Sequence, residues 1–175
     1  MAIIDNKKRL MFTSGDDLYF FTYNILIVLD VLNCTDGKVF KDYRKLPFVV
    51  DAISDNHFLN ILMRNDFGRV KNPTDRKHLV ASFTNCKIKT SEYLKLLFSL
   101  EKKGFISLSS KVNNQIDVTL NKQSIPKDFL KAEIFKNERD NASTLKKEVK
   151  QMSILNFETL IDRLYTSGTG QKWAV

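Results

Sequence analysis

The sequence predicts a mainly α-helical protein with a small β-hairpin, in which a winged-helix-like core is followed by a C-terminal helix. Six glycines and three prolines among 175 residues are too few for a turn-dense all-β architecture. Apolar residues recur at the three- and four-residue steps of helices, and 43% of the chain is hydrophobic, which is enough for a core. One helical stretch ends at a glycine and precedes two short alternating segments, which is the order of a winged helix.

The first helix is predicted over residues 18–33. Ser14 can cap this helix, and the acidic residues that follow it lie where the helix dipole favours negative charge. Apolar side chains occupy nearly the whole circumference of the helix, so we expect it to be central and buried. Asp36 and Gly37 supply the turn that follows.

Two further helices are expected next. Residues 39–53 have a helical pattern that Pro47 interrupts, which predicts either a break or two short helices. A helix over residues 57–63 follows, capped by Asp55 or Asn56.

The middle of the chain contains a polar stretch and a strong helix. We expect residues 65–77 to form a polar loop and residues 79–83 to form a short strand or connector. A helix begins at Thr90 and reaches Lys103, where a cation favours the end of a helix. Gly104 is the expected left-handed terminator.

A β-hairpin and more helices are predicted to complete the chain. Residues 105–109 and 115–120 alternate around an Asn-containing turn, as in a hairpin. A short helix over 127–136, a polar linker over 137–143 and a final helix over 143–165 follow.

This pattern divides the chain into a winged-helix-like helical domain over residues 1–136 and a linker, C-terminal helix and tail over residues 137–175. The final helix carries an apolar stripe. A stripe placed after a linker folds back onto the core or is buried by a partner, and both alternatives are open. The candidate partner-docking residues are Leu145, Val149 and Met152.

The net charge of +8, from 28 basic and 20 acidic residues, is spread along the chain and suits loose contact with phosphate or with an acidic protein. Five bases lie within fourteen residues and are candidates for nucleic-acid contact, although a solvated loop also explains them. A further candidate lies at the tip of the predicted wing. These six residues are Arg64, Arg69, Lys71, Arg76, Lys77 and Lys111.

The helix before the wing does not have the composition of a base-reading helix. The residues expected on its exposed face include no Arg, Asn or Gln, the side chains that bind base edges most specifically. This favours a winged helix that docks onto a protein. The expected exposed residues are Glu92, Lys95, Ser99, Lys102 and Lys103.

No catalytic motif, cofactor site or metal site is predicted. His57 and His78 lack a matched Ser, Cys or carboxylate motif, so we expect a protein that is not an enzyme. Cys34 and Cys86 have no metal-binding spacing and are predicted to be buried thiols in a reducing compartment. We expect a cytoplasmic protein, because no apolar run is long enough to cross a bilayer.

Three segments carry a family resemblance, at residues 23–29, 42–51 and 96–106. In the order of these segments and in the Lys-Leu-Pro-Phe motif that begins at Lys45, the chain resembles the small middle component of bacterial three-component ABC systems. These systems include the Lamassu anti-phage defence systems. The resemblance covers about residues 18–120.

The resemblance implies an accessory subunit that binds an SMC-like coiled-coil ATPase near its heads. The subunit would help to couple DNA sensing to an effector, commonly a nuclease, in anti-phage or anti-plasmid defence. Two alternatives remain open. One is a winged-helix DNA-binding transcriptional regulator, and the other is a kleisin-associated subunit of a condensin-like complex.

Overall fold

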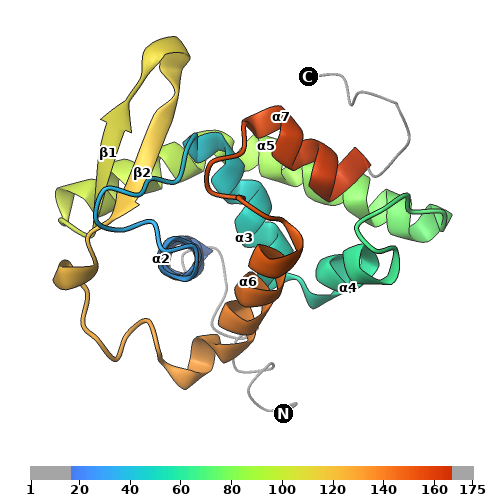
Figure 1. The fold of residues 1–175 in the computed structure, drawn as a ribbon, viewed down its shortest axis with the longest axis horizontal. Helices are drawn as coiled ribbons and strands as arrows, with labels where there is room; N and C mark the ends of the chain where they lie inside the picture. Colours follow the sequence, from blue (N-terminus) through green and yellow to red (C-terminus); the bar gives the residue numbers. More distant parts are fainter. Residues whose placement is uncertain (1–16, 167–175) are drawn as a thin grey trace.

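The computed structural model describes residues 17–166, and it confirms a mainly α-helical fold with a small antiparallel hairpin (Figure 1). Short single turns lie between the main elements, among them the 3-10 turn η1 (Tyr43–Lys45). The helices are α2 (Asp17–Val31), α3 (Leu46–Ser54), α4 (Asn56–Arg64), α5 (Pro73–Lys102), α6 (Lys136–Glu148) and α7 (Phe157–Ile161), and the strands are β1 (Ile106–Ser110) and β2 (Ile116–Leu120).

The hairpin has a third, single-residue partner. Ile106 pairs with Leu120 at one end of the hairpin and Ser110 pairs with Ile116 at the other. Phe40 exchanges both main-chain hydrogen bonds with Val118 of β2, at 2.8 and 2.9 Å. This antiparallel bridge places Phe40 beside β2 as a one-residue third edge of the hairpin.

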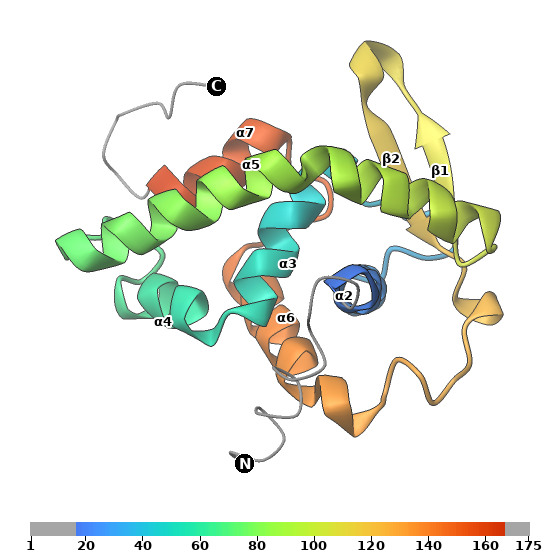
Figure 2. The ribbon, with the colours of Figure 1, turned by 180° about the vertical axis from the view of Figure 1, so that it is seen from behind.

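Helix α5 is longer than the sequence predicts: the expected loop is confirmed over residues 65–72 but not over 73–77, and the expected strand or connector over 79–83 is part of the helix. The helix begins at Pro73, whose missing N–H costs nothing in the first turn. The side chain of Asn72 accepts a 2.8 Å hydrogen bond from the main-chain N–H of Thr74 and caps the helix. Its 30 residues span ~45 Å, from α4 at one end to the hairpin at the other (Figure 2).

The predicted break near Leu46 is confirmed, because η1 ends at Lys45 and α3 begins at Leu46 with Pro47 in its first turn. Pro47 thus lies where no main-chain donor is needed. The predicted cap of α4 is confirmed, because the side chain of Asp55 accepts a 2.8 Å hydrogen bond from the main-chain N–H of His57. Gly104 adopts the predicted left-handed conformation, with φ of +79°.

The C-terminal segment differs most from the prediction. Residues 137–143 are helical within α6, residues 127–136 are mostly turns, and the continuous helix over 143–165 is interrupted after Glu148. Helix α6 is polar, but its core-facing side is held by tertiary contacts. One of them is Asn141, whose Nδ2 donates to the main-chain carbonyl of Ile53 at 2.8 Å.

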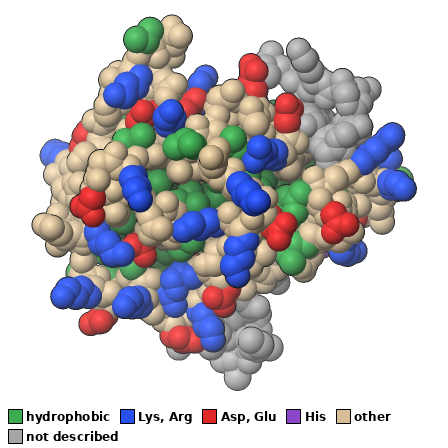
Figure 3. All heavy atoms as spheres, viewed as in Figure 1, with side chains coloured by type: hydrophobic (Ala, Val, Ile, Leu, Met, Phe, Trp, Pro, Cys, Tyr) green, Lys and Arg blue, Asp and Glu red, His purple; other side chains and the backbone are tan. Residues whose placement is uncertain are grey.

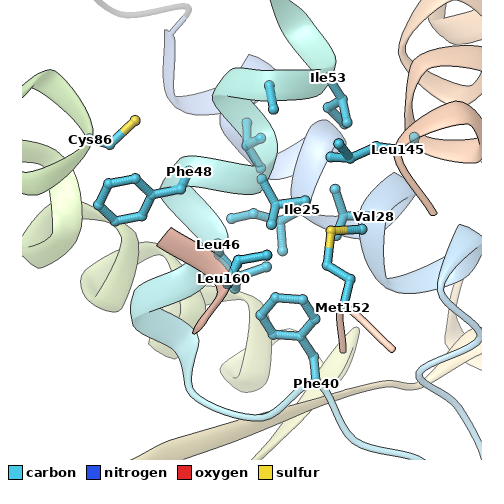
Figure 4. Close-up of a cluster of buried hydrophobic side chains, with 14 of the residues drawn as sticks. Ile25, Val28, Phe40, Leu46, Phe48, Ile53, Cys86, Leu145, Met152 and Leu160 are labelled. Carbon is cyan, nitrogen blue, oxygen red and sulfur yellow. The ribbon is translucent and has the colours of Figure 1, made fainter. Parts of the chain in front are cut away.

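A single hydrophobic cluster includes side chains from every long helix and from the hairpin. Ile25 and Leu29 of α2 are fully buried, which confirms the predicted central helix. Figure 4 shows Leu145 and Met152 among the α2 side chains and Phe40. Leu145, Val149 and Met152 are at most 2% exposed, so the chain's own core covers them. Of the two alternatives for this stripe, the structure shows that it folds back onto the core, where α6 shares one hydrophobic cluster with the helices before it.

The two thiols are buried and free, as predicted. Burial raises the pKa of Cys34 to about 11 and that of Cys86 to about 12, so both are protonated thiols near neutral pH. Within residues 17–166, no helix combines the length and the apolar character that crossing a bilayer requires.

Candidate partner-docking surface

The five basic residues predicted to contact nucleic acid lie around the end of α4 and the start of α5, and all are exposed. Two of them are held by neighbours. Arg64 forms a 3.0 Å ion pair with Asp75, and Arg76 donates to the main-chain carbonyls of Val70 and Lys71. The side chains of the remaining three, Arg69, Lys71 and Lys77, have no ion-pair or hydrogen-bond partner among residues 17–166.

Lys111 does not join this cluster. It lies at the tip of the hairpin, and the hairpin and α4 lie at opposite ends of α5 in both ribbon views (Figures 1 and 2). The basic side chains on the face of Figure 3 are also scattered and mixed with acidic ones. The six predicted residues therefore do not form one nucleic-acid surface.

An uncovered face of α5 is a better candidate site. In Figure 2 this helix crosses in front of α3, and no other described element lies in front of it. Eight residues of this face are exposed and follow one another at alternating steps of four and three residues. We call this set the outer stripe; its members are Lys77, Ala81, Thr84, Ile88, Ser91, Lys95, Phe98 and Lys102.

Two large apolar side chains project from the outer stripe. Ile88 is 69% exposed and Phe98 is 52% exposed, and Val80 next to the stripe is 38% exposed. The five residues predicted to be exposed before the wing are indeed exposed. The prediction missed Ile88 and Phe98, although the spacing of Phe98 from Lys95 and Lys102 places all three on one face.

The opposite face of α5 is fixed by polar contacts with α3 and its C-terminal cap. The hydroxyl of Ser82 donates to the carboxylate of Asp51 at 2.5 Å, and it lies 3.0 Å from the hydroxyl of Tyr165. One turn away, His78 Nε2 lies 2.7 Å from Asp55 Oδ2. Burial raises the pKa of Asp51, and the Ser82 hydrogen bond opposes that shift.

Aromatic packing reinforces this face. The ring of Tyr165 makes edge contacts with the rings of Phe48, Phe58 and Phe83, at centroid distances of 5.8, 5.3 and 5.4 Å. Through Phe83, these ring contacts add to the polar contacts that hold this face of α5 against α3. The outer stripe is thus presented on a rigid helix, which lowers the entropic cost of binding.

The charge of the outer stripe is entirely positive. It contains Lys77, Lys95 and Lys102 and no acidic residue. Of the three acidic residues of α5, Asp75 pairs with Arg64, and Glu101 accepts a 2.8 Å hydrogen bond from the main-chain N–H of Leu108. Only Glu92, beside the stripe, is an exposed acid of this helix.

A cleft of about 670 Å³ lies between the hairpin and the segment before α7. Its buried carboxylates are satisfied internally, because Asp42 binds Arg44 and Asp117 accepts from the main-chain N–H of Asp42. Bases and acids are balanced in its lining. The lining residues are Lys41, Asp42, Arg44, Lys111, Gln115, Asp117, Ile154, Leu155, Asn156, Phe157 and Glu158.

A buried lysine holds one wall of this cleft. Lys45 is 0% exposed, and its Nζ donates to the main-chain carbonyls of Met152, Ser153 and Leu155 at 3.0, 3.0 and 2.7 Å. Burial lowers the pKa of Lys45 to about 8, with Asp42 opposing the shift. The group is still mostly protonated at neutral pH, which matches three carbonyl partners with three N–H donors.

The two histidines, His57 of α4 and His78 of α5, lie together. Their rings meet edge to face at a centroid distance of 4.7 Å, and the ring of His78 also contacts Asp55. Within the described residues, no three His, Cys, Asp or Glu side chains are grouped so that they could hold a metal ion.

Comparisons with family models, with curated proteins and with solved structures find no significant match to this chain.

Proposed function

We propose that this chain is a non-enzymatic accessory subunit that docks onto a larger protein through the outer stripe of α5. The supporting observation is the exposure of Ile88 and Phe98 on a helix whose other face is locked in place. When a partner buries large apolar side chains on one face of a helix, their removal from water stabilises the complex.

The family resemblance indicates which partner to test first. It supports an SMC-like coiled-coil ATPase, with an effector subunit in the same cytoplasmic complex. In such a complex this subunit would help to couple DNA sensing to an effector nuclease in anti-phage or anti-plasmid defence.

The composition of the outer stripe favours protein over DNA as the partner. Lysines bind phosphates, but the stripe contains no Arg, Asn or Gln for reading base edges. Ile88 and Phe98 would also lie against the charged backbone of a duplex. A kleisin-associated subunit would use the same docking face, so the identity of the bound partner distinguishes the two complexes.

Co-expression of the tagged chain with the products of the adjacent open reading frames tests the proposal. We expect a large coiled-coil ATPase to co-purify with the chain, and we expect the double variant Ile88→Asp, Phe98→Asp to lose it. Val112→Asp is the matched control, because Val112 is 83% exposed at the hairpin tip and lies outside the outer stripe.

Thermal unfolding must show that the double variant is folded, so that a loss of binding reports on the surface. A chain that stays monomeric beside every neighbouring gene product contradicts the proposal. So does a folded double variant that still retains the partner.

A further inference from the structure

We propose that the segment bound by the outer stripe is an acidic amphipathic helix that packs lengthwise along α5. This inference rests on the proposed docking function and adds the chemistry of the partner. It is carried by the spacing, the size and the charge of the eight side chains in the stripe.

The spacing of the stripe suits a helix. Successive members are separated by four, three, four, three, four, three and four residues, from Lys77 to Lys102. That is the seven-residue repeat by which two helices pack side chains into each other's gaps along a shared seam. The stripe is ~38 Å long, so a partner helix of comparable length can lie along all of it.

The sizes of the side chains also suit a helix. Ala81 and Thr84 are small and precede Ile88 along the stripe, and the small Ser91 lies between Ile88 and Phe98, so each small side chain leaves a depression beside a larger one. Large apolar side chains of a partner helix fit into such depressions, while Ile88 and Phe98 project into the gaps of the partner.

The charges determine which helix is bound. Lys77, Lys95 and Lys102 have no hydrogen-bond or ion-pair partner among residues 17–166, and all are exposed. These lysines occupy positions of the stripe itself, from which a long side chain can extend its ammonium group to the edges of a packed helix, where opposite charges select the partner. The partner seam is therefore apolar and is flanked by Asp and Glu.

The same charges oppose a second copy of this chain as the occupant. Two α5 helices packed in antiparallel fashion would bring Lys77 of one copy near Lys102 of the other. Like charges at such positions are unfavourable, and Glu92 is the only exposed acid of α5 that could offset them.

Fluorescence anisotropy with two designed peptides tests the inference on the full chain. Both peptides are labelled four-heptad helices with Leu at the seam; one carries Glu at all flanking positions and the other carries Lys. We expect the Glu peptide to bind at least tenfold more tightly than the Lys peptide. Replacing Lys77, Lys95 and Lys102 by Glu should reverse this preference.

A matched control separates the stripe from overall charge. Lys127, Lys131 and Lys147 are also exposed, and replacing these three by Glu changes the net charge equally outside α5. We expect this control to keep the preference for the Glu peptide. Equal binding of both peptides, or an equal loss in both triple variants, would overturn the inference.

The natural complex gives a second, independent measurement. A photo-crosslinking amino acid at Ser91 in the co-purified complex should attach to a helix rich in Asp and Glu. A crosslink to a basic segment, to duplex DNA or to a second copy of this chain contradicts the inference. If the partner depends on Ile88 and Phe98 but crosslinks through such a segment, the docking function stands and only the acidic helix is wrong.

Discussion

The ammonium group of Lys45 donates a 2.7 Å hydrogen bond to the main-chain carbonyl of Leu155, 110 residues later in the chain. It also binds the carbonyls of Met152 and Ser153. Residues 149–156 lie between α6 and α7 and contain no regular helix or strand, so a single buried side chain supplies hydrogen bonds that regular structure would otherwise provide.

Replacing Lys45 by Met should loosen this segment. Met fills a similar volume but leaves three carbonyls without their donor, so we expect a loss of ~2–4 kcal/mol in the free energy of unfolding. Hydrogen exchange should accelerate most in residues 149–156. Lys41→Met is the control, because Lys41 is exposed, and its effect should stay within ~0.5 kcal/mol. Unchanged exchange in the Lys45 variant would contradict the assignment.

The pH dependence of stability should also report on Lys45. Its pKa is lowered to about 8 in the folded chain, against an ordinary 10.5. Between these values the unfolded chain binds a proton that the folded chain lacks, so folding is favoured as pH rises. We expect the stability advantage of the wild type over Lys45→Met to grow above pH 8, by at most ~1.4 kcal/mol per pH unit. Urea unfolding at several pH values measures this, and a constant or shrinking advantage opposes it.

Asp51 should have the opposite dependence. Burial raises its pKa, so folding favours the protonated carboxyl. The stability that the protonated Asp51 carboxyl contributes is fully present below 3.8, the ordinary pKa that applies in the unfolded chain. This stability is lost as pH rises through the higher pKa of the folded chain. Asp51→Asn cannot ionise and still accepts from Ser82. Its stability relative to the wild type should therefore increase with pH in urea titrations from acidic to neutral pH. The exposed control Glu158→Gln should show no such trend, and a flat difference for Asp51→Asn would refute this account.

Two adjacent residues of α5 test how this helix is oriented. Leu97 is 0% exposed, whereas Phe98 is 52% exposed. Leu97→Ala should cost ~2–5 kcal/mol in thermal or urea unfolding, and Phe98→Ala within ~0.5 kcal/mol. Equal losses for the two variants would mean that Phe98 is not free for a partner.

The C-terminal segment should prove essential to stability. Leu145 is fully buried, so Leu145→Ala should lower the free energy of unfolding by ~2–5 kcal/mol. Ile154→Ala is the matched control, because Ile154 is 47% exposed. Its loss in the free energy of unfolding should be well below that of Leu145→Ala. Cooperative urea unfolding that is insensitive to Leu145→Ala would show that the segment is separate from the core after all.

Local sequence signals predicted the elements that local interactions determine. The all-round apolar character of residues 18–33 indicated a central helix, and Gly104 followed by alternating residues indicated the hairpin. The sequence also contained the signal for the start of α5, a capping Asn72 followed by Pro73 in the first turn. The prediction missed this signal because the residues around it are polar. Residues 79–83 were ambiguous, since a short apolar run suits a strand or a helix.

Long-range contacts decided the rest, and the sequence could not show them. Polar residues 137–143 resemble a linker, yet Asn141 bonds to Ile53 and the helix packs on the core. The burial of Leu145 depends on α2 and α3, which are distant in sequence. For the candidate site, the charges before the wing were predicted, whereas the exposure of Ile88 required the full length of α5 to be known.

The place of Tyr165 also affects how the chain folds as it is made. The rings of Phe48, Phe58 and Phe83 precede Tyr165 by more than 80 residues, and its ring contacts all three. On a ribosome, a nascent chain that has reached only α6 must keep these aromatic rings partly in contact with water. Closure of this aromatic cluster therefore has to wait until Tyr165 has been made.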